Sequence, residues 1–136
     1  MALATIKILV RGEDSDGRVG IVESVMAAGA AGPPLHVHDF DEAFFIVEGE
    51  LTFQLGDRLM NVGVGGLAFA PGGTPHTVAN LSAQPARYVL VCTPAGFERE
   101  FARRAARSAG TAPPAWAMQP VPEVRYVGPR IGETRV

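Results

Sequence analysis

The chain has 136 residues, a hydrophobic fraction of 47% and a formal net charge of −2. This length fits one domain with an ample apolar core, and the near-neutral charge gives no reason to expect a nucleic acid or an anionic membrane as partner. Cys92 is the single cysteine, which excludes an intrachain disulfide and suits a reducing compartment. The N-terminal apolar run is too short for a signal peptide and no stretch approaches a membrane span, so a cytoplasmic location is expected.

Two β-strands are predicted ahead of a loop of small residues. Residues 4–10 and 19–27 alternate and are rich in β-branched side chains, as strands are. Residues 11–20 contain Gly-Glu-Asp and Asp-Gly and are predicted to form a turn. Pro33 and Pro34 keep the chain extended after the loop, and we expect them to fix how His36 enters the segment that follows.

All three histidines of the chain lie in two short segments. His36 and His38 are two residues apart, so on a strand both imidazoles point to the same side. Glu42 adds a carboxylate if the intervening turn brings it to that face, and His76 comes from another strand. Three imidazoles and one carboxylate are a recognised ligand set for a first-row transition metal. The sequence therefore predicts one divalent ion on these four residues, its identity open among Fe, Mn, Ni, Zn, Co and Cu.

Six more short strands follow at regular spacing with glycine turns between them. They are predicted at residues 42–47, 51–55, 59–64, 67–70, 77–80 and 87–92. No helical pattern separates them, which argues against β-α-β units. The pattern predicts an all-β fold, either a closed antiparallel barrel or a jelly roll.

A helix is predicted where the composition changes at Thr93. Thr93 is a suitable cap with a proline after it, and Gly110 is a suitable end. Phe97, Phe101 and Ala105 share one face at a spacing of four. The predicted parts are thus a barrel of residues 1–94, a helix of residues 95–110 and an arm of residues 111–136.

The predicted helix is basic. Ten acidic and five basic residues precede Thr93, whereas four acidic and seven basic residues lie from Thr93 onwards. Arg103, Arg104 and Arg107 suit the helix dipole in the last turns. No aromatic residue interleaves with these arginines, so we expect a solvated face, or contact with acidic barrel surface, rather than nucleic-acid binding.

The C-terminal arm holds five of the eleven prolines together with Trp116 and Tyr126. A disordered tail rarely keeps these aromatic residues. An extended arm is expected, packed on the barrel or on a second subunit, with a short strand at residues 124–127. Because the N-terminal strand and this arm are available to cover the sheet edges of a neighbour, a homodimer is expected.

Two motifs resemble those of the cupin superfamily. The first family motif reads HxH, three or four residues, E, six residues, G, and the second reads G, five residues, PxG, two residues, H, three residues, N. The first motif is usually opened by a glycine, and here that position is Ala30. The matching residues are His36, His38, Glu42 and Gly49 for the first motif, and Gly65, Pro71, Gly73, His76 and Asn80 for the second.

The resemblance implies the cupin double-stranded β-helix, a jelly-roll barrel, over about residues 6–101, with a metal on the four ligands named above. Residues 93–101 and 127–130 are similar to the C-terminal part of small single-domain cupins grouped with quercetin dioxygenases. That similarity implies an O₂-dependent ring-cleaving oxygenase. A metal-dependent isomerase or polyketide-type cyclase, and a non-catalytic small-molecule-binding cupin, remain alternatives.

The barrel strands favour an apolar or aromatic small-molecule substrate. Arg58 and Arg87 are the only basic residues between Arg18 and Arg99, whereas carboxylate or phosphate substrates normally need a cation. Glu42 is the candidate catalytic residue, a base that exchanges between the metal and a substrate proton. The candidate pocket walls are Phe44, Ile46, Phe53, Met60, Phe69, Val78, Tyr88, Leu90 and Cys92.

Three polar residues are candidates for supporting the ligands. Asn80 is expected to fix the turn that carries His76. Asp39 and Asp41 are expected either to orient a ligand imidazole or to be exposed loop carboxylates.

Overall fold

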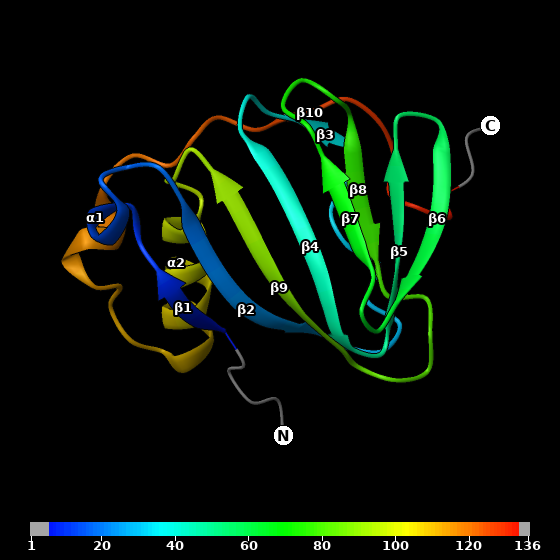
Figure 1. Ribbon diagram of the computed structural model, residues 1–136. Helices are drawn as coiled ribbons and strands as arrows, with labels where there is room; N and C mark the ends of the chain where they lie inside the picture. Colours follow the sequence, from blue (N-terminus) through cyan, green and yellow to red (C-terminus); the bar gives the residue numbers. More distant parts are fainter. Residues whose placement is uncertain (1–5, 134–136) are drawn as a thin grey trace.

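Two five-stranded antiparallel sheets form the body of the molecule in a computed structural model, which describes residues 6–133 (Figure 1). The first sheet has the order β1 (Lys7–Val10), β2 (Gly20–Met26), β9 (Ala86–Thr93), β4 (Asp41–Glu48) and β7 (Leu67–Ala70). The second has the order β10 (Arg125–Tyr126), β3 (His36–Val37), β8 (His76–Ala79), β5 (Glu50–Leu55) and β6 (Arg58–Gly63). The predicted all-β jelly roll is confirmed.

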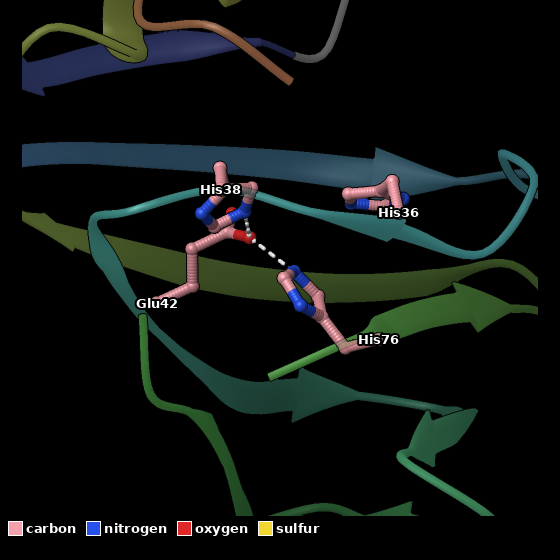
Figure 2. Close-up of side chains that lie close together, drawn as sticks. All are labelled: His36, His38, Glu42 and His76. Atoms are coloured by element: carbon pink, nitrogen blue, oxygen red, sulfur yellow. Dashed lines mark hydrogen bonds and ion pairs between the residues drawn. The ribbon is translucent and has the colours of Figure 1, made fainter. Parts of the chain in front are cut away.

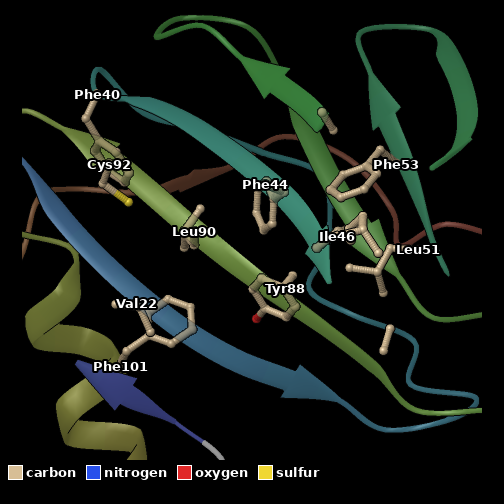
Figure 3. Packing of buried hydrophobic residues seen from close by; sticks show 13 residues of the cluster. Val22, Phe40, Phe44, Ile46, Leu51, Phe53, Tyr88, Leu90, Cys92 and Phe101 are labelled. Carbon is tan, nitrogen blue, oxygen red and sulfur yellow. The ribbon is translucent and has the colours of Figure 1, made fainter. Parts of the chain in front are cut away.

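Alternation along the strands places the core between the two sheets. On β9, Ala86, Tyr88, Leu90 and Cys92 are buried and face inward, while the residues between them are more exposed. Side chains from β4 and β5 meet them, so the inner faces of both sheets share one apolar cluster (Figure 3). The labelled members of this cluster are Val22, Phe40, Phe44, Ile46, Leu51, Phe53, Tyr88, Leu90, Cys92 and Phe101.

The predicted strands lie within a few residues of the observed ones, and the part of the first prediction before residue 6 lies outside the described residues. One local prediction was wrong: the turn expected at residues 11–20 contains a short helix, α1 (Gly12–Ser15). A buried carboxylate explains its position, because Glu98 Oε2 accepts a 2.7 Å hydrogen bond from the Gly12 N–H. The glycine thus lies against a residue 86 positions later, which local sequence does not indicate.

The C-terminal helix, α2 (Glu98–Ala109), begins later than predicted. Thr93 does not cap it, because β9 continues to Thr93, which pairs with Asp41 of β4. Glu98 also accepts a 2.7 Å hydrogen bond from the Gly96 N–H, which ties the preceding turn to the start of the helix. The helix ends at Gly110 as predicted, where φ is 70° and the left-handed backbone favours glycine.

The basic residues of α2 do not form a purely solvated face. Arg103 donates through Nε and Nη2 to the carbonyls of Ala117 and Gln119, each at 2.7 Å, and Arg99 donates to that of Pro120 at 2.8 Å. These carbonyls belong to the 3-10 helix η1 (Ala115–Met118) and the segment after it. The helix therefore uses two arginines to hold the C-terminal arm.

The arm then returns across the barrel of its own chain. Tyr126 of β10 pairs with His36 of β3, and the Val127 N–H donates to the Leu35 carbonyl at 2.8 Å. Arm and barrel therefore make one continuous sheet next to the histidines. In the described part of the chain, no helix has the length and apolarity needed to cross a membrane.

Candidate metal centre

The structure brings together the four residues predicted to bind a metal (Figure 2). His36 lies on β3 and His38 just after it, Glu42 lies on β4, and His76 begins β8. His36 and His76 are directly paired across the ladder of β3 and β8. One potential ligand atom from each residue lies within 4.8 Å of those of the other three. Two strands of one sheet and one of the other thus supply a single cluster.

Backbone carbonyls orient all three imidazoles. The Nδ1 atoms of His36, His38 and His76 lie 2.8, 3.0 and 2.9 Å from the carbonyl oxygens of residues 34, 40 and 74. A carbonyl only accepts, so each Nδ1 carries the proton and, in the neutral ring, each Nε2 presents a lone pair. Backbone carbonyls therefore play the orienting role considered for Asp39 and Asp41.

Glu42 is 4% exposed and lies against two of the imidazoles. Its Oε1 is 2.7 Å from His38 Nε2 and 2.8 Å from His76 Nε2. Burial by itself raises the pKa of Glu42, but the hydrogen bonds with His38 and His76 outweigh it and lower the pKa to about 2. Burial lowers the pKa of His36, so that ring is neutral at neutral pH. The cluster thus contains an ionised carboxylate.

The close contacts of Glu42 require a positive charge between the atoms. Burial alone would lower the pKa of His76, but the hydrogen bond with Glu42 raises it overall, since a proton on Nε2 relieves the contact between two acceptors. A divalent metal ion relieves the same contact for all the ligands at once. Two ligand atoms that each lie about 2.1 Å from one ion, at right angles, are roughly 3 Å apart. This is close to the 2.7 and 2.8 Å between Glu42 and the two imidazoles. The donor set therefore suits a transition metal, and it leaves the metal's identity open.

Two turns that carry the ligands are fastened to each other. The Gly73 N–H donates to the His38 carbonyl at 2.8 Å, and the Gly72 N–H donates to Asp41 Oδ1 at 2.7 Å. A Cβ at Gly72 would lie 2.1 Å from the carbonyl oxygen of Asp39, so only glycine allows this approach. Asp41 thus holds the turn before His76 rather than an imidazole.

Asn80 has a different role from the one expected. It is fully buried, and its Nδ2 donates to the carbonyls of Met26 and Gln84 at 3.1 and 2.7 Å. Its Oδ1 accepts from the backbone N–H and the hydroxyl of Ser82. Asn80 therefore fixes the loop after β8 and not the turn that carries His76, because it lies at the opposite end of that strand.

A cavity of about 320 Å³ opens beside the cluster, and His36, Glu42 and His76 form part of its wall. Four predicted wall residues line it: Phe44, Val78, Tyr88 and Leu90. The other predicted wall residues do not line it, because they lie elsewhere along the inner faces or point outward. Ile46, Phe53 and Cys92 are buried in the core (Figure 3), Met60 packs against the core, and Phe69 is 47% exposed on the outside.

The helix and the arm supply most of the wall residues that the sequence did not indicate. Phe97, Glu100, Phe101 and Arg104 come from α2 and the residue before it, and Val121, Pro122, Val124 and Tyr126 come from the arm. The spacing of Phe97 and Phe101 indicated an apolar helix face. It did not indicate that the face would cover the barrel opening. Arg104 in particular brings a cation to a cavity whose strands supply none.

Comparison with known proteins gives a family and several related folds. A sequence-family model described as Cupin domain matches residues 22–92. The protein TT1209 from Thermus thermophilus is 27% identical, with a TM-score of 0.57 over 68% of this chain and 87% of that one. DMSP lyase DddQ from Ruegeria pomeroyi is also 27% identical, with a TM-score of 0.51 over 57% of this chain and 39% of that one.

A third structure shares the fold at lower identity. It is a predicted oxalate decarboxylase from Thermotoga maritima, 19% identical, with a TM-score of 0.61 over 65% of this chain and 78% of that one. No curated protein matches the chain at a significant level.

Proposed function

The chain belongs to the cupin domain family, and from that premise we propose that it is a metal-dependent enzyme of the dioxygenase type. Its substrate in this proposal is an apolar or aromatic small molecule with an acidic enol or phenol oxygen, as in flavonol-like compounds. The metal would be held by His36, His38, Glu42 and His76, whose cluster suggests metal binding.

The cavity beside the cluster is the observation that carries this proposal. Its volume of about 320 Å³ lies near the lower end of the range for small-molecule pockets, roughly 300–1,000 Å³. Three of the four candidate ligands share its wall with five hydrophobic or aromatic side chains that can contact a flat ring. These are Phe44, Tyr88, Leu90, Phe97 and Phe101.

In this proposal Glu42 takes a proton from the substrate. With a pKa of about 2, its carboxylate accepts a proton readily only from a strongly acidified group. A phenol titrates near pH 10, so Glu42 alone cannot ionise it. A divalent ion bound to the cluster would supply the positive charge that favours the phenolate. The apolar walls of the cavity would then exclude water from the proton transfer.

A titration of metal-loaded protein tests the proposal. Elemental analysis of untagged protein comes first, followed by addition of simple phenols and flavonols to the iron, cobalt or nickel form. We expect the phenols to shift the metal spectrum and to be consumed together with O₂. If no phenol shifts the spectrum while sugar acids or small carboxylates do, the apolar-substrate proposal fails and the oxygenase proposal fails with it.

At a metal concentration that saturates both proteins, the variant Glu42→Gln should lower turnover more than it weakens phenol binding, because the proton acceptor is lost while three imidazoles still hold the metal. Glu48→Gln is the matched control, since Glu48 lies on the same strand but pairs with Arg87 on the outer face at 2.8 Å. Equal losses of binding and turnover in Glu42→Gln would contradict the role as base.

The same experiment separates the two alternative functions. Turnover without O₂ consumption would favour an isomerase or a polyketide-type cyclase. Retained metal and bound phenol without turnover across a substrate panel would favour a non-catalytic binding protein.

A further inference from the structure

We propose that Arg104 forms an anion-binding subsite in the cavity, so that the substrate carries a carboxylate or similar anionic group in addition to its phenol or enol oxygen. This inference rests on the proposed function, because it narrows the substrate class of the same site. It starts from an unexpected finding: α2 contributes a guanidinium to a cavity whose barrel strands contribute none.

Arg104 is held in place by two aromatic rings. Its guanidinium carbon lies 4.9 Å from the ring centroid of Phe101 and 5.9 Å from that of Phe97. Cations at these distances interact with the ring face, and a planar guanidinium is limited in its orientation there. The group is therefore partly ordered before a ligand arrives, which lowers the entropic cost of binding.

The terminal nitrogens of Arg104 remain available to a ligand. Its Nε donates to Glu100 Oε2 at 3.0 Å, and within residues 6–133 its hydrogen bonds involve no other nitrogen. The side chain is 48% exposed, so a ligand can reach it. Two terminal N–H groups in one plane match the two oxygens of a carboxylate.

Arg104 is only partly neutralised by the carboxylate beside it. Glu100 also lines the cavity, but the same oxygen that accepts from Arg104 accepts from Arg107 at 3.3 Å, so two guanidiniums share its carboxylate. Arg104 is the one lysine or arginine among the residues found to line the cavity in the described chain. An anionic group that entered the cavity would therefore meet this guanidinium.

Phe97 connects the subsite to the metal cluster. Its ring centroid lies 6.3 Å from the ring of His38 and 5.9 Å from the guanidinium carbon of Arg104. The two distances place Arg104 at most about 12 Å from the ring of His38, a span that a molecule of one or two rings can cover. Such a molecule would place its phenol or enol oxygen at the cluster and its anionic group at Arg104.

Two ligands of nearly equal shape test the subsite. They are 3-(4-hydroxyphenyl)propionate and its neutral amide, titrated into metal-loaded protein by calorimetry. We expect the wild-type protein to bind the carboxylate about tenfold more tightly, since charge-assisted hydrogen bonds are about twice as strong as neutral ones and 1.4 kcal/mol is a factor of ten. In Arg104→Gln the preference should disappear while the affinity for the amide stays the same.

Arg107→Gln is the matched control. It makes the same change of charge on the same helix and removes a contact with the same Glu100, but Arg107 does not line the cavity. The preference for the carboxylate should survive in this variant. Both arginines are substantially exposed, at 48% and 64%, so neither variant should threaten folding.

The cobalt spectrum, recorded during the same titrations, separates the two proposals. Spectral shifts by both ligands without an Arg104-dependent preference would overturn the subsite and leave the phenol proposal standing. A lost preference in Arg104→Gln without any spectral shift would support the subsite and overturn the phenol proposal. Absence of binding by both ligands, or a carboxylate preference that survives in Arg104→Gln, would overturn the subsite.

Discussion

His76→Ala should remove most of the stabilisation that a metal gives this protein without unfolding the barrel. The imidazole of His76 is buried and makes two hydrogen bonds, to the Thr74 carbonyl at 2.9 Å and to Glu42 at 2.8 Å. At about 1 kcal/mol for each bond plus lost packing, its removal should cost about 2–4 kcal/mol. Domains are typically stable by about 5–15 kcal/mol, so metal-free His76→Ala should still fold.

A bound metal should add more to the free energy of unfolding of the wild-type protein than to that of the variant. At a free metal concentration of about 100 Kd, binding adds about 2.7 kcal/mol to the free energy of unfolding. For a chain of 136 residues this corresponds to a rise in Tm of roughly 8–10 °C. Mutation of a group that orients a ligand costs up to about 100-fold in metal affinity. If the loss of a direct ligand costs at least that much, the same metal concentration adds at most about 0.4 kcal/mol, or roughly 1 °C.

Thermal melts with and without metal measure both the stability lost with the His76 side chain and the stability gained from the metal. Elemental analysis gives the metal content. Thr52→Ala is the control, because it removes a 2.7 Å hydrogen bond to Asn61 on β6 and lies opposite Ala79, at the other end of β8 from His76. The control should have a lower Tm than the wild-type protein but show the same rise in Tm when metal is added. An unchanged metal content or an equal rise in His76→Ala would refute the ligand assignment. Failure of the metal-free variant to fold would show that His76 is needed for the fold itself.

Three further outcomes follow from the packing. Gly72→Ala should weaken metal binding at least tenfold in chelator competition, because its Cβ would lie 2.1 Å from the Asp39 carbonyl oxygen. Gly63→Ala is the control: its Cβ would have no atom within 4 Å, and the variant should bind metal normally. Burial raises the pKa of the Cys92 thiol above its ordinary 9.0, so with rising pH this thiol ionises in the unfolded chain before it does in the folded protein. The free energy of unfolding, measured by urea melts, should therefore fall above about pH 9, and Cys92→Ala should remove this fall. We also propose a homodimer in which a second copy covers the outer face of β4 and β7, where Phe69 is 47% exposed; Phe69→Glu should be monomeric by light scattering, and a monomeric wild type at micromolar concentration would contradict this.

The proposed dimer surface differs from the one that the sequence suggested. The N-terminal strand and the Trp116 arm were expected to cover a neighbour. In the structure β1 pairs with β2, and the arm is held by Arg103 of the same chain. The arm is thus used within one chain, whereas β1 still lies at the edge of the first sheet. We place the proposed dimer contact on the outer face of β4 and β7 because exposed apolar side chains gather there.

The sequence by itself determined the strands and the candidate ligands. Both follow from local rules: alternate residues of a strand share a face, and few residue types bind transition metals. His36 and His38 could therefore be paired from their spacing, and His76 from the turn motif that precedes it. The breaks between strands could be read from the glycines in the same way.

Only the tertiary structure decided what surrounds the ligands. Glu98, the first residue of α2, accepts a hydrogen bond from Gly12, which is 86 residues earlier in the chain. The groups that orient the imidazoles are backbone carbonyls, which carry no sequence signal. The wall formed by Phe97 and Arg104 exists because α2 covers the barrel opening. Periodicity indicates which residues of an element share a face, but only the packing of distant elements determines what that face contacts.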